Sequence, residues 1–105
     1  MANIPQIQIQ EAKKKFDLKE CRFLDVRDRA SYSAAHIPGA IHLDDANVQE
    51  FIDKSDKNKE TVVYCYHGNS SLGAVAYLLE NVFKTVSSMR GGFEAWRQIY
   101  ETEPE

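Results

Sequence analysis

The chain has 105 residues, of which 43% are apolar and 28% are charged, and its formal net charge at pH 7 is −3. This length predicts one domain around one hydrophobic core, and the acidic balance argues against a broad nucleic-acid-binding surface. No apolar stretch approaches the ~20 residues that a membrane-spanning helix needs, so no membrane association is expected.

The setting expected for the chain is the reducing cytoplasm. Its N-terminus lacks the basic and apolar segments of a secretory signal. The two cysteines, Cys21 and Cys65, fall in different apolar segments, and proteins of a reducing compartment rarely keep a disulfide. We therefore interpret Cys21, which lies inside a strand-like segment, as inert packing.

Short strand-like segments alternate with helical patterns along the first half of the chain. An alternating apolar segment at 7–9 predicts a brief strand, and good helix formers follow at 10–16. A second strand is predicted at 21–26. The next helix is expected at 28–35, where the first residue, an aspartate, is a suitable N-cap, and a third short strand is expected at 40–43.

The same alternation continues through the second half of the chain. Apolar residues at helical spacing predict a helix at 47–54, and β-branched residues predict a fourth strand at 61–65. A helix is predicted at 70–80, with one apolar face, and a fifth strand at 85–89. The last helix is expected at 93–100, and its large aromatic side chains, Phe93 and Trp96, are expected in the core.

Strands that alternate with helices predict parallel β–α–β units, and hence an α/β domain whose sheet is covered by helices on both faces. Active sites of such sheets lie at the carboxyl ends of the strands. Three features with reactive or charged side chains lie at the carboxyl ends of predicted strands: Asp25 with Arg27, then Cys65, then Arg90. The topology predicts that they converge at one edge of the sheet.

Cys65 gives the strongest indication of chemistry. A predicted strand ends there, and a short, small and polar loop containing Gly68 leads into the helix at 70–80. Converging backbone N–H groups and the positive end of a helix dipole both favour a thiolate. The alternative is an inert cysteine that closes a core strand. The small residues of the loop, which leave space above the sulfur, favour the functional interpretation.

Four segments together resemble the motifs of rhodanese domains. Segments 24–28 and 36–41 look like the paired N-terminal motifs, 65–71 looks like the active-site loop, and 91–96 looks like the C-terminal signature. The resemblance covers about residues 5–100, and the loop is most similar to that of single-domain thiosulfate sulfurtransferases of the bacterial GlpE type.

The resemblance implies a single rhodanese domain over 1–105, with a core at about 5–100. Its fold would be a five-stranded parallel sheet with helices on both faces. The remaining residues, 101–105, are expected to form a frayed tail.

The resemblance further implies sulfur transfer by a ping-pong mechanism through a persulfide on Cys65. The donor would be thiosulfate, and the acceptor would be cyanide or a cellular thiol or dithiol such as thioredoxin. No metal and no cofactor are implied. The persulfide would be held by the loop, whose backbone N–H groups suit an anion: Tyr66, His67, Gly68, Asn69, Ser70 and Ser71.

The charge of the loop departs from the pattern of many rhodaneses, which place Arg or Lys next to the cysteine. Here the only cationic candidate in the loop is His67, so we expect weak binding of the thiosulfate dianion. Arg27 and Arg90, each at a strand end, are candidates to attract the anion. The competing interpretations are an ion pair with a carboxylate for Arg27 and a solvated surface position for Arg90.

The remaining polar candidates have structural interpretations. Asp25 is expected to tie down neighbouring N–H groups, and His36 and His42 to fix a turn by hydrogen bonds. His67 as a general base for Cys65 is a further hypothesis. The histidines and cysteines do not have the spacing of a zinc site.

Three other functions compete with thiosulfate sulfurtransfer. A cysteine-dependent phosphatase would need an arginine six residues after the cysteine, where this chain has Ser71. A persulfide carrier fed by a desulfurase needs the same Cys65, so the sequence does not separate it from the thiosulfate enzyme. A non-enzymatic binding module would be favoured by loss of the cysteine, which is present here.

Overall fold

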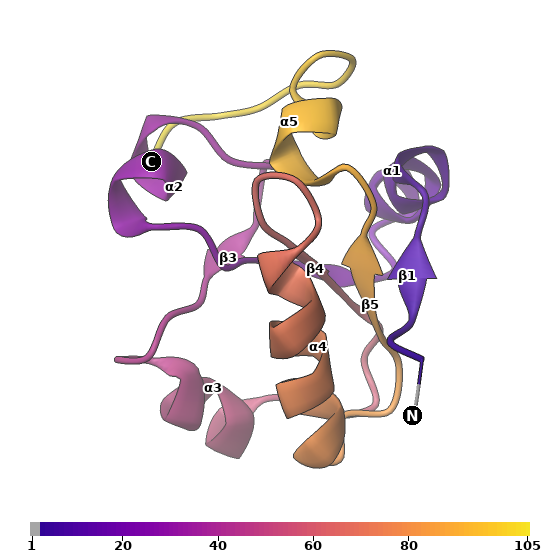
Figure 1. Cartoon of the computed structure of the whole chain (residues 1–105), viewed down its shortest axis with the longest axis vertical. Helices are drawn as coiled ribbons and strands as arrows, with labels where there is room; N and C mark the ends of the chain where they lie inside the picture. Colours follow the sequence, from indigo (N-terminus) through magenta and orange to yellow (C-terminus); the bar gives the residue numbers. More distant parts are fainter. Residues whose placement is uncertain (1–2) are drawn as a thin grey trace.

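The computed structural model describes residues 3–105, which form a five-stranded sheet whose strands alternate with helices along the chain. The strand order is β1-β5-β4-β2-β3, and all neighbouring strands are parallel (Figure 1). This confirms the expected architecture. In chain order the elements are β1 (Gln6–Ile7), α1 (Ile9–Leu18), β2 (Arg22–Asp25), α2 (Arg29–Ala34), β3 (Ile41–His42), α3 (Val48–Lys54), β4 (Thr61–Tyr64), α4 (Ser70–Glu80), β5 (Val86–Met89) and α5 (Gly92–Trp96).

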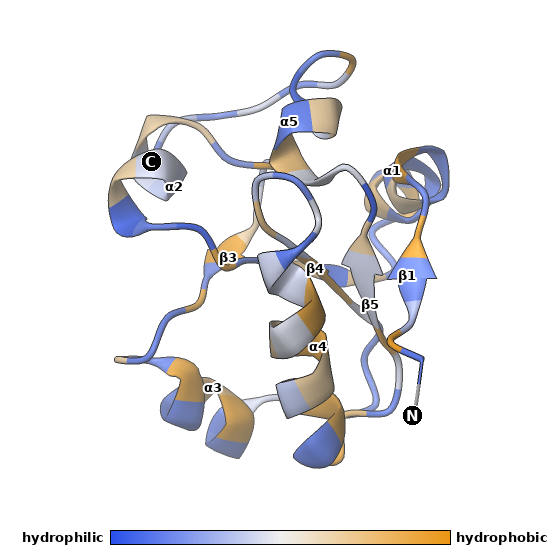
Figure 2. Cartoon of the chain, viewed as in Figure 1, coloured by the Kyte–Doolittle hydropathy of each residue, from blue (hydrophilic) through white to orange (hydrophobic). Residues whose placement is uncertain are grey.

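The sheet divides the core into two layers, because successive side chains of a strand point to opposite faces. Phe23 packs in the layer that contains residues of α1 and α5, whereas Leu24 packs in the layer that contains residues of α3 and α4. Phe93 and Trp96 are buried in the first layer, as expected. Along α3, hydrophobic and hydrophilic residues alternate in Figure 2, which is typical of a helix with one buried side.

Most elements lie close to their predicted positions, and α4 has the predicted bounds. The first strand is displaced from 7–9, because β1 pairs with β5 through Gln6 and Ile7 and the helix α1 already begins at Ile9. The last helix, α5, ends at Trp96 rather than near residue 100. There the indole N–H donates a 2.9 Å hydrogen bond to the carbonyl of Glu101, which folds the chain back.

The expectation of a frayed tail at 101–105 is wrong. The backbone of Glu103 exchanges two hydrogen bonds of 2.9 Å with His36, and the N–H of Glu105 donates to the carbonyl of Ser33 at 3.0 Å. The last residues therefore lie along α2, where Figure 1 places the C-terminus. Their backbone groups find partners that an isolated tail would lack.

The carboxyl ends of the parallel strands open at one edge of the sheet, where the loop between β4 and α4 lies next to α5 (Figure 1). Within residues 3–105, no helix combines the length and the apolar character needed to cross a membrane.

Candidate active site

The Cys65 sulfur sits in a cradle of hydrogen-bond donors. Cys65 directly follows β4, and its side chain is buried. The backbone N–H of Gly68 donates to Sγ at 3.2 Å, and that of Ser71 donates at 3.3 Å. The Ser71 hydroxyl oxygen lies 3.3 Å from the same sulfur. Two N–H donors and one hydroxyl group of the same loop thus surround a single sulfur atom, and the hydroxyl can donate to the sulfur when it is a thiolate.

A second serine supports the cradle from the neighbouring strand. Ser88, near the end of β5, places its Oγ 2.7 Å from the Oγ of Ser71, and both side chains are buried. When the sulfur is ionised, Ser71 must donate its proton to the sulfur, so Ser88 donates to Ser71. The sequence analysis did not identify Ser88. The available signal was a small hydroxyl residue at the carboxyl end of a buried strand.

The environment of Cys65 favours the thiolate. Burial alone would raise the pKa of the thiol, but hydrogen bonds from the Ser71 side chain and from the N–H groups of Ser71, Gly68 and His67 outweigh it, and the pKa is lowered. Cys21 shows the opposite balance, because burial raises its pKa to about 11. Both cysteines are free, but only Cys65 has the surroundings of a nucleophile.

The loop conformation depends on two glycines. Gly68 has φ +95°, and a Cβ there would lie 3.2 Å from the N of Gly91. Gly92 has φ +61°, and a Cβ there would overlap the carbonyl of Tyr66. The space for a Cβ at Gly92 is occupied because α5 caps the loop: the N–H of Phe93 donates to the carbonyl of Cys65 at 2.8 Å.

The other side chains of the loop are exposed at its rim: Tyr66, His67, Asn69 and Ser70. They face solvent, so the loop reaches the sulfur through its N–H groups and Ser71. In the described part of the chain, the ring of His67 makes no hydrogen bond to Cys65. The Tyr66 hydroxyl donates to the Oγ of Ser31 at 2.8 Å and so connects the loop to α2.

Arg27 lies beside the loop, but its charge is paired. Its Nη2 is 2.6 Å from Asp25 Oδ2 and 2.6 Å from the Ala35 carbonyl oxygen, and the ion pair is buried. Its guanidinium also lies 4.0 Å from the ring centroid of Phe93. The side chain therefore ties the end of β2 to α2 and α5, and Asp25 neutralises the charge that an anion would meet.

Arg90 has a different environment. It follows β5, it is exposed, and its carbonyl carbon lies 3.8 Å from the position of a Cβ on Gly68. Within residues 3–105 its guanidinium forms no ion pair. The structure thus brings the backbone of Arg90 close to Gly68 of the loop, and the exposed guanidinium has no carboxylate partner among the described residues.

The two remaining histidines hold the chain around β3. His36 Nδ1 lies 2.8 Å from the carbonyl oxygen of Tyr32, and His42 Nε2 lies 2.7 Å from that of Arg27. Over the described residues, no three His, Cys, Asp or Glu side chains come together as metal ligands would.

Comparisons with known proteins agree with this geometry. A family profile described as "Rhodanese-like domain" matches residues 8–99. A Pseudomonas fluorescens (strain Pf0-1) protein named "Thiosulfate sulfurtransferase GlpE" is 51% identical over 80 residues, which cover 76% of this chain and 73% of that protein. A protein of the same name from Pseudomonas savastanoi pv. phaseolicola is 49% identical over 80 residues, which cover 76% of each chain.

Solved structures show the same fold. The solution structure of the rhodanese-like domain of the Alr3790 protein from Anabaena sp. has a TM-score of 0.85 and 29% identity, and the match covers 98% of this chain and 81% of that one.

Proposed function

We propose that this chain, which belongs to the family of rhodanese-like domains, is a thiosulfate sulfurtransferase that carries sulfur on Cys65. The observation that supports this most is the convergence of two N–H donors and the Ser71 hydroxyl on one buried sulfur. The name of the Pseudomonas relatives, at about half identity, supports thiosulfate as the donor.

The first half-reaction needs no proton transfer. The Cys65 thiolate attacks the outer sulfur of thiosulfate and forms a new S–S bond. The S–S bond within thiosulfate breaks, and sulfite leaves with the electron pair. The product on the enzyme is the persulfide anion Cys65–S–S⁻. The donors from Gly68 and Ser71 stabilise the attacking thiolate on Sγ, and after this step the negative charge lies on the outer sulfur of the persulfide, next to the same loop.

The second half-reaction returns Cys65 to the thiolate. A nucleophile attacks the outer sulfur of the persulfide, and the S–S bond to Cys65 breaks with its electron pair on Cys65. Cyanide gives thiocyanate, and a thiolate gives a new persulfide on the acceptor. With a dithiol such as thioredoxin, the second thiol then releases hydrosulfide and forms a disulfide. This chemistry needs a reduced Cys65, which the cytoplasm would maintain.

The charge of the site predicts weak binding of thiosulfate. The loop contains no Arg or Lys, the chain carries a net charge of −3, and Arg27 is paired with Asp25. Arg90 is then the main cation that can attract the dianion, and we assign it that role. The same shortage of cations favours, as a second candidate function, a carrier that receives its sulfur from a desulfurase.

A phosphatase and a binding module fit the site less well. At the position where a phosphatase needs an arginine, Ser71 is buried and hydrogen-bonded to Ser88, so nothing there can grip a phosphate with two parallel hydrogen bonds. A binding module without catalysis would have no need for a thiol whose pKa is lowered by its loop.

The proposal is tested by thiocyanate formation from thiosulfate and cyanide. The wild-type chain should turn over, Cys65→Ser should be inactive, and the matched control Cys21→Ser should keep its activity within about twofold. Activity that survives in Cys65→Ser would contradict the proposal.

A further inference from the structure

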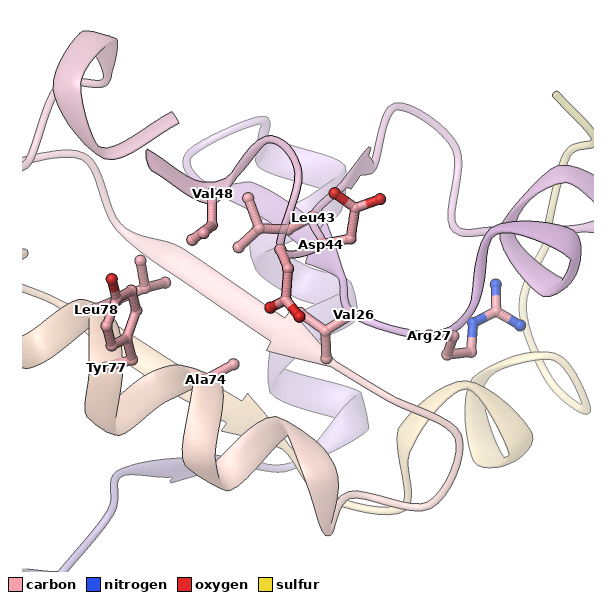
Figure 3. Close-up of a pocket in the computed structure, with 9 residues that line it drawn as sticks. Val26, Arg27, Leu43, Asp44, Val48, Ala74, Tyr77 and Leu78 are labelled. Atoms are coloured by element: carbon pink, nitrogen blue, oxygen red, sulfur yellow. The ribbon is translucent and has the colours of Figure 1, made fainter. Parts of the chain in front are cut away.

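An apolar groove lies between α4 and the segment that joins β3 to α3. It has a volume of about 580 Å³, which is within the range of ligand-binding pockets. Figure 3 shows Tyr77 and Ala74 on one side and Val48 and Leu43 on the other. The apolar residues that line it are Val26, Leu43, Val48, Ala74 and Leu78.

One lining residue of the groove is hydrogen-bonded to the strand that ends at the reactive cysteine. Val26 lines the groove. Its N–H donates a 3.0 Å hydrogen bond to the carbonyl of Tyr64, the residue that precedes Cys65. Asp25 is paired with Tyr64 in the register of β2 and β4, so Val26 follows in line with Cys65. The thiol is held by Ser71 of α4, and α4 also supplies groove residues. The thiol and the groove therefore share one face of the sheet.

The charge of the groove is negative. Asp44 and Asp45 line it and are exposed. Asp44 is held in place, because its carboxylate accepts N–H groups of Ala46 at 2.9 Å and Asn47 at 3.1 Å. Arg27 also reaches the groove, but its guanidinium is turned away from the other lining side chains in Figure 3 and is paired with Asp25.

The apolar lining and the acidic residues together disfavour small anionic substrates and favour a basic peptide segment with an apolar side chain. Thiosulfate, and small thiols that carry carboxylates, would meet like charge from Asp44 and Asp45. A polypeptide with an apolar side chain and a neighbouring Lys or Arg would contact both the apolar lining residues (the floor of the groove) and the exposed Asp44 and Asp45 (its acidic rim).

We propose that the groove docks a segment of the protein thiol that takes sulfur from Cys65, with an apolar side chain on the floor and a basic one against Asp44 and Asp45. This inference rests on the proposed function. Docking there would hold the acceptor on the face of the sheet where the thiol lies.

The test uses single-turnover discharge of the Cys65 persulfide by two short cysteine peptides, followed by intact mass. One peptide, acetyl-Leu-Lys-Gly-Cys-Gly-amide, offers the apolar and basic groups. The other, acetyl-Gly-Glu-Gly-Cys-Gly-amide, does not. The ratio of their rates defines the peptide preference. Because their thiols differ in intrinsic reactivity, the decisive quantity is the change of this preference between variants.

Two variants alter the groove without touching the cradle. Ala74→Trp fills the floor, and Asp45→Lys reverses charge at the rim. Glu80→Lys, an exposed position at the other end of α4, is the matched control for charge. We expect each groove variant to reduce the peptide preference by about tenfold, which corresponds to about 1.4 kcal/mol. The control should keep the wild-type preference, and discharge by cyanide should stay within twofold in all four proteins.

A preference that is unchanged in both groove variants would overturn the docking site. Failure of the proposed function looks different, because thiosulfate would then not load Cys65 in the wild-type chain. In that case fluorescence polarisation of a labelled Leu-Lys peptide, with serine in place of its cysteine, tests the groove directly. Binding to the unloaded wild type that weakens in Asp45→Lys but not in Glu80→Lys would support it, and equal binding by all three would reject it.

Discussion

Removing the Ser71 hydroxyl should raise the pKa of Cys65, because the thiolate loses one of its hydrogen-bond donors. Ser71→Ala keeps the N–H donor of residue 71 and the N–H of Gly68, so one of the three donors within hydrogen-bond distance of the sulfur is lost. A hydrogen bond to a charged group contributes about 1.5–3 kcal/mol, and the long 3.3 Å distance places this one at the lower end. This loss of about 1.5 kcal/mol destabilises the thiolate relative to the thiol, so the pKa of Cys65 should rise.

The pKa of Cys65 is measured from the pH dependence of the rate at which iodoacetamide alkylates its thiol. All proteins in this assay also carry Cys21→Ser, so that Cys65 is the thiol that reacts. The matched control is Ser70→Ala, an exposed neighbour at the first position of α4. With thiosulfate as substrate, kcat/KM should rise with pH through the Cys65 pKa, and this rise should move to higher pH in Ser71→Ala. A pKa in Ser71→Ala equal to that of the control would refute the role of the hydroxyl.

The same shift has a consequence for stability. The pKa of Cys65 is lower in the folded chain than its ordinary value, so its ionisation stabilises the fold at high pH. This contribution is complete above the ordinary thiol value and is lost as the pH falls through the folded pKa. Relative to Cys65→Ser, the unfolding free energy of the wild type should therefore rise with pH over this interval, and a fall would contradict the assigned direction.

Four further substitutions probe the site and the residues around it. Gly92→Ala should lower the free energy of unfolding in urea by more than about 2 kcal/mol and reduce turnover, because its Cβ would overlap the loop. Gly73→Ala should instead raise the free energy of unfolding by about 0.5–1 kcal/mol, because a Cβ at that position meets no neighbouring atom within 4 Å. Asp25→Ala should cost about 3–5 kcal/mol, since it leaves Arg27 buried without its partner, and an unchanged urea midpoint would show that the pair is dispensable. Arg90→Glu should raise the KM for thiosulfate severalfold with unchanged unfolding, and an unchanged KM would remove Arg90 from the site.

Local patterns in the sequence were sufficient to predict most of the architecture. The helix α4 was predicted to its ends because its apolar spacing and its preceding polar loop agree. Cys65 could be located because a β-branched strand and a glycine-containing loop adjoin it. Each of these signals lies within about ten residues of the feature that it predicts.

Features formed by contacts between distant segments were missed. Ser88 of β5 supports Ser71 of α4 from 17 residues further along the chain, and no pattern in either segment encodes that contact. The pairing of Glu103 with His36 likewise joins segments that are far apart, which is why a frayed tail was expected. The resemblance identified the Gly-Gly signature, but its physical role became visible only where Gly92 packs against the loop.

The central claim is that Cys65 carries the transferred sulfur, and intact mass tests it most directly. Purified chain is incubated with thiosulfate, freed of excess reagent, and weighed before and after addition of cyanide, beside Cys65→Ser and Cys21→Ser. The account predicts a gain of one sulfur atom in the wild type and in Cys21→Ser, its removal by cyanide, and no gain in Cys65→Ser. A gain that persists in Cys65→Ser, or no gain in the wild type, would contradict it.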